Sequence, residues 1–201
     1  MLLTAAISAV FQVLVLTGVP FGVYILYHRW RYKRRLGEVA ARAGLRFGEP
    51  RYLVYSLVLA IAVALVLIIW PPPIEPLTRP GSAQRQFVGL GLGADSIVLA
   101  LLYGVVKTGF TEELLFRGLI AGSLSRRLSF VWANLFQALI FLLPHFAILF
   151  VAREVSGILP IVFVGALVFG WVRIRSGSIL GSWLMHAAGN VTMALVVAAR
   201  T

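Results

Sequence analysis

Long apolar segments separated by short polar ones dominate the pattern along the chain. Crossing about 30 Å of hydrocarbon takes about 20 helical residues, and six segments come near that length. They lie roughly at residues 3–27, 52–70, 96–124, 129–151, 158–173 and 178–199. The first has no basic residues ahead of it and is longer than the apolar part of a signal peptide, so we expect a membrane span. The pattern predicts an all-α, polytopic transmembrane helix bundle of about six spans.

The connecting segments suggest a division of the chain near residue 94. We expect residues 1–94 to form N-terminal transmembrane helices with one basic and one Pro-rich loop, the latter at residues 71–86. Residues 95–201 would form the helical core that carries the polar motifs. The glycines at 89, 91 and 93 lack the spacing and the βαβ context of a nucleotide-binding loop. We interpret them as a flexible approach to the third span, capped by Asp95 or Ser96.

The composition agrees with membrane insertion. Hydrophobic residues make up 60% of the 201 residues and charged ones 12%, whereas soluble domains have about 45–50% and about 25%. The excess of apolar residues is too large for a buried core, so it must face lipid. The chain has no Cys, which excludes disulfides and thiolate metal sites.

The basic residues predict an orientation in the membrane. The net charge is +11, and most bases fall in loops that alternate to one side of the bundle. These are Arg29, Arg31, Lys33, Arg34, Arg35, Arg42, Arg46, Arg51, Arg126, Arg127, Arg173 and Arg175. The positive-inside rule assigns that side to the cytoplasm and both termini to the outside. We expect a multi-pass protein of a prokaryotic plasma membrane whose bases attract anionic lipid headgroups.

Two further interpretations depend on this charge pattern. Residues 28–51 could form an interfacial helix on lipid headgroups, but a solvated topogenic loop is the preferred interpretation. No basic face is interleaved with exposed aromatic residues, so we expect no binding of nucleic acid.

Ionisable residues lie inside the predicted third span, where each costs at least about 2.5–3.5 kcal/mol to insert. They are Lys107, Glu112, Glu113 and Arg117. Glu113 precedes Arg117 by four residues, which is the favourable order for a helical ion pair. Glu112 lies about 100° around the helix from Glu113, so Arg117 cannot easily serve both carboxylates. The spacing predicts one neutralised carboxylate and one that is free to react.

Polar residues also recur at helical intervals in the fourth and sixth spans. Asn134, Gln137, Phe141 and His145 form one stripe that should face the bundle interior. Pro144 removes a backbone donor and is expected to kink the helix beside the imidazole. The sixth span carries a pair on one face, His186 and Asn190, surrounded by small residues that permit close helix packing.

These three motifs resemble those of the CAAX protease and bacteriocin-processing family, intramembrane proteases that include the type II CAAX prenyl endopeptidases. The matching motifs are E-E-x-x-x-R at residues 112–117, F-x-x-x-H at 141–145 and H-x-x-x-N at 186–190. They occur in the same order as in the family. The resemblance covers roughly residues 95–198 and implies a protease that acts on a membrane-associated protein or peptide.

The resemblance also implies a role for each matching residue. Glu112 would be the general base that activates water, and His145 would help to hold that water. His186 and Asn190 would stabilise the oxyanion of the tetrahedral intermediate. Glu113 and Arg117 would support the catalytic helix, with Phe141 beside them. Peptide hydrolysis independently requires a positioned base and preorganised donors at the oxyanion.

Several alternatives stay open at this point. A zinc-dependent protease could use Glu112, His145 and His186 as ligands, but the H-E-x-x-H spacing is absent. We therefore favour a mechanism without a cofactor. Lys107, Glu112 and His145 could instead form the relay of an ion-coupled transporter, although the chain has no internal repeat. A non-catalytic immunity protein on the same scaffold is the third alternative.

Overall fold

The computed structural model describes residues 2–151 and 153–201, and these ranges are helical with no strand. Six helices are long and apolar enough to cross a membrane. Their bounds are Leu2–Tyr32, Pro50–Ile69, Ala94–Leu124, Phe130–Val151, Ile158–Ser176 and Leu180–Arg200. The predicted all-α bundle of six spans is therefore confirmed. Met1 and Ala152 fall within the predicted ranges 1–94 and 95–201 but lie outside the described residues, and the division near residue 94 stays a prediction.

Three of the six spans consist of several helical segments. The first contains α1 (Leu2–Val13), η1 (Leu14–Gly18) and α2 (Val19–Tyr32). The third contains α6 (Ala94–Leu101), η3 (Leu102–Phe110), η4 (Glu113–Ala121) and α7 (Gly122–Leu124). The fourth contains α8 (Phe130–His145) and α9 (Ile148–Val151). The second, fifth and sixth are α4 (Pro50–Ile69), α10 (Ile158–Ser176) and α11 (Leu180–Arg200). The connections contain α3 (Leu36–Arg42), α5 (Ile74–Leu77), η2 (Ala83–Phe87) and η5 (Arg153–Val155).

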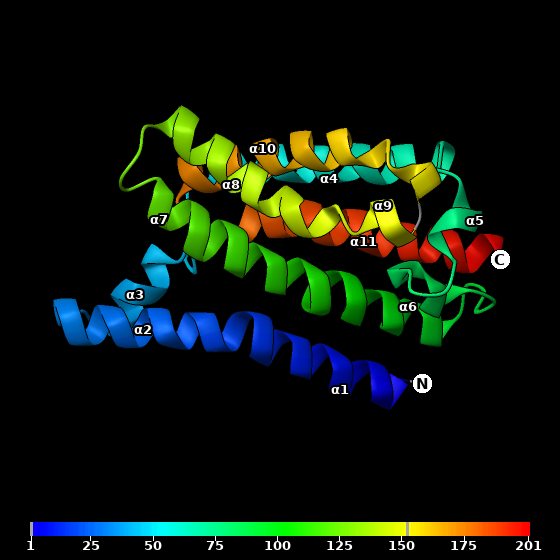
Figure 1. Ribbon diagram of the computed structural model, residues 1–201, viewed down its shortest axis with the longest axis horizontal. Helices are drawn as coiled ribbons and strands as arrows, with labels where there is room; N and C mark the ends of the chain where they lie inside the picture. Colours follow the sequence, from blue (N-terminus) through cyan, green and yellow to red (C-terminus); the bar gives the residue numbers. More distant parts are fainter. Residues whose placement is uncertain (1, 152) are drawn as a thin grey trace.

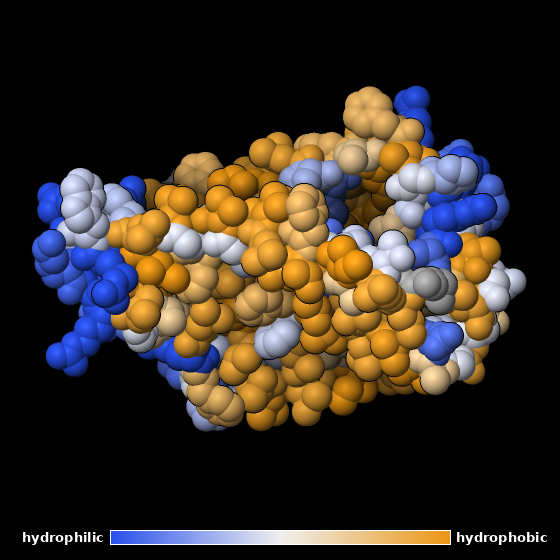
Figure 2. Space-filling view, turned by 90° about the horizontal axis from the view of Figure 1, so that it is seen from below, coloured by the Kyte–Doolittle hydropathy of each residue, from blue (hydrophilic) through white to orange (hydrophobic). Residues whose placement is uncertain are grey.

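The helices run side by side along the long axis of the molecule, with both termini at one end (Figure 1). Helix α11 packs against α4 and against the third span, while α10 packs mainly against α8. The first span lies at the edge of the bundle, on the third span. Figure 2 shows an apolar belt around the middle of the molecule, between hydrophilic ends. This is the surface expected of a protein that spans a bilayer.

The third span is wound largely as a π-helix. Its π-helical segments, η3 and η4, each extend over nine residues. The wider winding leaves backbone carbonyls for other donors: the hydroxyl of Thr108 donates to the carbonyl of Tyr103 (2.9 Å), and the indole of Trp183 on α11 donates to that of Val105 (2.8 Å). π-Helical turns are rare and often occur at functional sites. Here they lie on either side of Thr111 and Glu112.

Close packing between the third span and α11 depends on Gly104. A Cβ atom at this position would lie 2.6 Å from Cγ2 of Val191 and 2.8 Å from its backbone nitrogen. Real Cβ contacts are almost never that short, and the backbone nitrogen cannot rotate away. Glycine at residue 104 therefore fixes how closely the two helices that carry the glutamates and His186 approach each other.

The fourth span ends its regular helix at the predicted kink. Helix α8 stops at His145, one residue after Pro144, and a turn through Phe146 and Ala147 leads into α9. Proline cannot donate to the preceding turn, which favours this break. The expected distortion is thus an interruption of the helix directly beside the imidazole.

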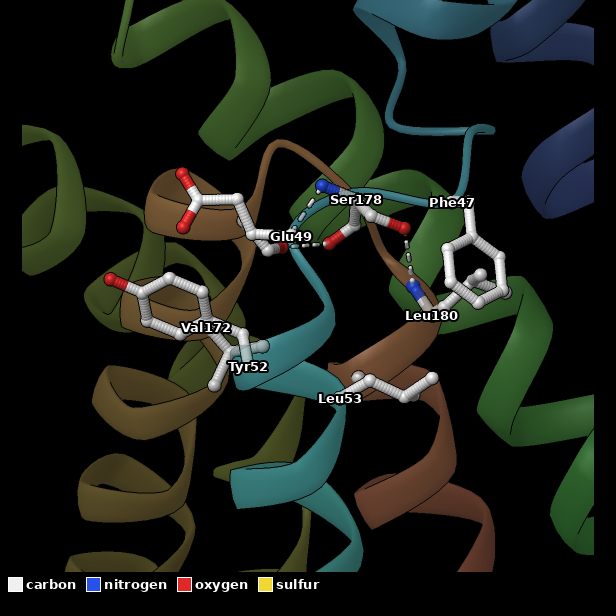
Figure 3. Close-up of a pocket in the computed structure, with 9 residues that line it drawn as sticks. Phe47, Glu49, Tyr52, Leu53, Val172, Ser178 and Leu180 are labelled. Atoms are coloured by element: carbon white, nitrogen blue, oxygen red, sulfur yellow. Dashed lines mark hydrogen bonds between the residues drawn. The ribbon is translucent and has the colours of Figure 1, made fainter.

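The basic segment after the first span is more ordered than a solvated loop. Helix α3 forms within it, and Val39 and Ala43 are fully buried. Residues 44–49 then cross the α10–α11 turn: the carbonyl of Gly44 accepts from the backbone N–H of Ile179 (3.0 Å), and that of Ser176 from Glu49 (3.3 Å). Figure 3 shows Glu49 and Ser178 at this crossing. The preferred interpretation of a solvated loop therefore misses a short helix whose Val39, and the adjacent Ala43, are buried.

Candidate active site

The centre of the bundle contains a buried ion pair within the third span. Oε1 of Glu113 lies 3.1 Å from Nη1 of Arg117, and both side chains are wholly buried. This is the pair that the four-residue spacing predicts. The guanidinium stacks over two aromatic rings, 4.0 Å from the centroid of Phe141 and 5.3 Å from that of Phe169. Cation–π contacts of this kind stabilise a cation that has little other solvation.

None of the three guanidinium nitrogens of Arg117 has a hydrogen-bond partner with good geometry among the described residues. Its contact with Glu113 is therefore an ion pair at short distance, supported by the rings of Phe141 and Phe169. Phe169 on α10 was not among the predicted site residues. One phenylalanine among many apolar residues of a span gives no sequence signal that it faces a cation.

His186 on α11 connects the two adjacent glutamates. Its Nδ1 lies 2.9 Å from Oε1 of Glu113, and its Nε2 lies 3.8 Å from Oε2 of Glu112. Because the ion-paired carboxylate of Glu113 is an acceptor, Nδ1 carries the proton and donates it there. In the neutral ring, Nε2 is then an unprotonated nitrogen that faces Glu112. A carboxylate that orients an imidazole in this way fixes both its tautomer and its direction.

Glu112 and His145 line one cavity of about 360 Å³. The side chain of Glu112 is 26% exposed, whereas that of Glu113 is fully buried. Nδ1 of His145 lies 2.8 Å from the backbone carbonyl of Phe141. A carbonyl only accepts, so Nδ1 donates to it and leaves Nε2 as an acceptor in the neutral ring. The third and fourth spans thus bring a carboxylate and an imidazole acceptor to the same cavity.

Asn190 lies one turn from His186 on α11 and points to the third span. Its Nδ2 donates to the hydroxyl of Thr108 (2.7 Å), and that hydroxyl donates to the carbonyl of Tyr103 (2.9 Å). Asn190 is not among the residues that line the cavity of Glu112 and His145. Thr108 was missed in the sequence, although a hydroxyl four residues before Glu112 in a span was the available signal.

Asn134 and Gln137 face the interior as predicted, but they connect two helices instead of joining the site. The amide of Asn134 donates to the carbonyl of Leu167 (3.0 Å), and that of Gln137 to the carbonyl of Ala166 (2.8 Å). Both acceptors lie on α10. Gly170 provides the space, since a Cβ there would lie 2.1 Å from Oδ1 of Asn134. This stripe therefore holds α8 against α10.

The donor set does not fit a preformed zinc site. In residues 2–151 and 153–201, no group of three His, Asp or Glu side chains is arranged to hold a metal ion. His186 has its Nδ1 at hydrogen-bond distance from Glu113. A structural or catalytic zinc needs at least three converging protein ligands. The alternative set Glu112, His145 and His186 would require a rearrangement of the side chains.

The relay proposed for a transporter is also not assembled. Lys107 is partly buried, and its side chain forms no ion pair with Glu112 in the described part of the chain. Glu112 instead pairs with His186, whose Nε2 lies 3.8 Å from Oε2 of the carboxylate.

Comparisons with known proteins agree with the motifs. The family model described as type II CAAX prenyl endopeptidase Rce1-like matches residues 94–192. That range contains the glutamate pair, Arg117, the Phe141–His145 motif and the His186–Asn190 motif. Neither the curated proteins nor the solved structures gave a match. With its six apolar helices and this match, the chain is an integral, multi-pass membrane protein that belongs to the Rce1-like family of CAAX-type membrane proteases.

Proposed function

We propose that this protein is an intramembrane endopeptidase that hydrolyses peptide bonds of membrane-associated proteins or peptides with a glutamate-activated water. The observation that carries the proposal is the shared cavity of Glu112 and His145. A partly exposed carboxylate and an imidazole acceptor at one cavity are the groups needed to orient a water molecule. Family membership supports proteolysis, and the residue roles below are our inference from the geometry.

In this mechanism a water molecule donates one hydrogen bond to Glu112 and the other to Nε2 of His145. Both are acceptors, because Nδ1 of His145 donates to the carbonyl of Phe141. Glu112 takes a proton from the water while the oxygen attacks the scissile carbonyl carbon. The protonated Glu112 then transfers this proton to the leaving nitrogen when the C–N bond breaks. Base and acid are the same carboxyl group in successive steps.

The developing oxyanion needs hydrogen-bond donors, and His186 is the nearest group to Glu112 that could provide one. Its Nδ1 already donates to Glu113, so Nε2 donates only when the ring is an imidazolium. Nε2 of the ring faces Oε2 of Glu112 at 3.8 Å, so a donor there would point to the place where the reacting groups meet. Asn190 would add an amide donor from the next turn of the same helix. Its contact with Thr108 keeps the amide directed to the third span.

Arg117 and Glu113 act as positioning residues in this proposal. Glu113 holds His186, and the guanidinium of Arg117 lies 3.1 Å from Glu113 in a buried site. The rings of Phe141 and Phe169 in turn hold the guanidinium. None of these groups touches the reacting water, but together they fix the distance between His186 and Glu112.

The place of the cavity suggests how a substrate arrives. It lies among apolar residues of three spans, including Leu16 on the first and Phe116 on the third. The first span packs on the third and lies at the edge of the bundle. A peptide that reaches this cavity therefore approaches from the lipid phase or from the interface. We accordingly assign membrane-associated substrates and, with the basic loops facing the cytoplasm, a prokaryotic plasma membrane.

The test is cleavage of a library of membrane peptides by the purified protein in lipid nanodiscs, with mass spectrometry of the products. Glu112→Gln should abolish cleavage and leave the melting temperature close to that of the native protein, because glutamine keeps the shape but cannot accept the proton. Leu143→Gln, on an exposed position of α8, is a control for introducing an amide into the membrane. Cleavage by Glu112→Gln at the native rate would exclude the proposed base.

The same assay decides between the water mechanism and its zinc-dependent alternative. We expect o-phenanthroline and EDTA to leave the rate unchanged, because the donor geometry does not fit a zinc site. Loss of activity on chelation, with recovery when one equivalent of zinc is returned, would establish the metal-dependent mechanism. Complete absence of cleavage across the library, by folded protein, would favour a non-catalytic immunity protein.

A further inference from the structure

A second cavity, of about 240 Å³, lies at the basic end of the bundle. Four arginines contribute to its lining: Arg34, Arg42, Arg126 and Arg127. Arg34 precedes α3, Arg42 is the last residue of α3, and the other two lie in the turn between α7 and α8. Ser123, which also lines this cavity, is about three helical turns beyond Glu112 on the third span. The cavity is thus separate from the proposed active site.

The arginines of this cavity have little compensating negative charge. Glu38 is the only carboxylate in an ion pair with them among the described residues; it lies 4.0 Å from Arg34, and 54% of its side chain is exposed. Burial lowers the pKa of Arg126, and the charges of Arg42 and Arg127 lower it further, against the opposing effect of Tyr24. Like charges held this close repel one another. An anion in the cavity would remove that repulsion.

The cavity is also built with hydrogen-bond donors. Nη2 of Arg126 donates to the hydroxyl of Tyr24 (3.0 Å) and to that of Ser123 (3.2 Å), which fixes the direction of its guanidinium. The Nε atoms of Arg34 and Arg42 are buried and have no hydrogen-bond partner in the part of the chain that the structure describes. Buried donors of this kind usually have a partner. Arginine forks match the oxygens of a phosphate group in geometry and charge.

Aromatic side chains place this cavity at the level of lipid headgroups. Tyr27 and Tyr32 line it, with their hydroxyl oxygens 3.4 Å apart, and the neighbouring Trp30 is 78% exposed. Exposed Trp and Tyr residues at the end of an apolar span mark the interface between hydrocarbon and water. The hydrophilic end in Figure 2 that carries these basic residues is next to the apolar belt. A phosphate in the cavity would therefore be at the depth where phospholipid phosphates lie.

We propose that this cavity is a binding site for the phosphate group of an anionic phospholipid. A headgroup without its own cation fits best, since four arginines repel the ammonium of a zwitterionic lipid. Inorganic phosphate offers the same oxygens but lacks acyl chains to lie against the apolar belt. The lipid should therefore bind more tightly than the free ion. The site is independent of whether the protein cleaves peptides.

The experiment measures lipid binding to the full-length, delipidated protein in detergent by native mass spectrometry. Phosphatidylglycerol, phosphatidylcholine and inorganic phosphate are titrated separately. The test variant is Arg34→Gln with Arg127→Gln, two residues that line the cavity and whose only ion pair among the described residues is that of Arg34 with Glu38 at 4.0 Å. The matched control is Arg29→Gln with Arg35→Gln, two exposed bases from the same region that do not line the cavity. Both variants lose the same charge.

We expect the native protein to prefer phosphatidylglycerol over phosphatidylcholine. The cavity variant should weaken phosphatidylglycerol binding about tenfold, because each basic side chain at the interface contributes measurably to anionic-lipid affinity. The control pair should change the affinity by less than about twofold. Equal weakening by both pairs would show diffuse attraction and overturn the site. Inorganic phosphate binding as tightly as the lipid would overturn the assignment to a headgroup.

A second pair of variants keeps the test valid if the double substitution unfolds the protein. Arg127→Glu places a negative charge at the rim of the cavity, on the exposed turn before α8, and Arg35→Glu places one outside it. The first should weaken phosphatidylglycerol binding more than the second. Indistinguishable affinities for the two would again overturn the proposal. Melting temperatures of all variants confirm that the folded protein is being compared.

Discussion

Two adjacent glutamates take opposite environments because one residue of helix changes the direction of a side chain by about 100°. Glu113 is fully buried and paired with Arg117, while Glu112 is 26% exposed at a cavity. The sequence was sufficient to predict the pair, since the four-residue spacing lies within one helix. It could not predict that His186 lies between both carboxylates, because that depends on how α11 packs against the third span.

Arg117→Ala should destabilise the protein by about 3–5 kcal/mol, as expected when one partner of a buried ion pair is left alone. It should also lower the cleavage rate, since Glu113 would no longer hold His186 in place. Thermal unfolding in detergent and peptide cleavage measure the two effects. Arg85→Ala, at an exposed position of η2 before the third span, is the control and should leave both unchanged. Native-like melting of Arg117→Ala would contradict the structural role.

The contact between Asn190 and Thr108 gives a graded prediction. Asn190→Ala should lower the cleavage rate by about 10²–10³, the usual effect of losing one oxyanion donor. Thr108→Val removes only the group that orients the amide, so a loss of at most about tenfold is expected. Thr4→Val on the exposed face of the first span is the control. An unchanged rate in Asn190→Ala, with the protein folded, would remove this residue from the proposed oxyanion site.

At the scale of whole elements, the π-helical winding of the third span is the feature that sequence patterns do not reveal. The choice between i−4 and i−5 bonding depends on contacts from other helices, such as the indole of Trp183 on the carbonyl of Val105. Helix α3 was underestimated for a similar reason. Val39 in α3 and Ala43 directly after it are buried by tertiary contacts. The sequence of a charge-rich segment does not indicate such contacts. The long apolar spans could be predicted without any knowledge of tertiary contacts.

Gly104→Ala tests the close approach of the third span to α11. The added Cβ would lie 2.8 Å from the backbone nitrogen of Val191, so the helices must separate. Overpacking of this kind costs about 1–3 kcal/mol. Gly165→Ala on α10 is the matched control, since a Cβ there meets no atom within 4 Å. We expect a lower melting temperature and slower cleavage only for Gly104→Ala. Equal melting temperatures for the two variants would contradict this packing argument.

At the scale of the whole molecule, the six-span architecture was predictable because lipid imposes a length and an apolar composition on every span. The neighbours of each helix could not be predicted, since apolar periodicity gives little information about which helices pack against each other. Both polar motifs of the fourth and sixth spans reach the interior, yet Asn134 and Gln137 bond to α10 while His186 bonds to Glu113. The spacing predicts that the residues of each motif share one helix face. Which of them contact a neighbouring helix and which join the candidate site depends on how the helices pack.

The orientation in the membrane can be tested directly because the chain has no native Cys. Gly37 in α3 and Gly157 before α10 are exposed, and a side chain at either position meets no atom within 4 Å. Three spans separate them, so they lie on opposite sides of the bilayer. With the basic loops in the cytoplasm, a membrane-impermeant maleimide should label Gly157→Cys in intact cells. Gly37→Cys should react only after permeabilisation. The reverse pattern would invert the orientation, and labelling of both from outside would contradict six spans.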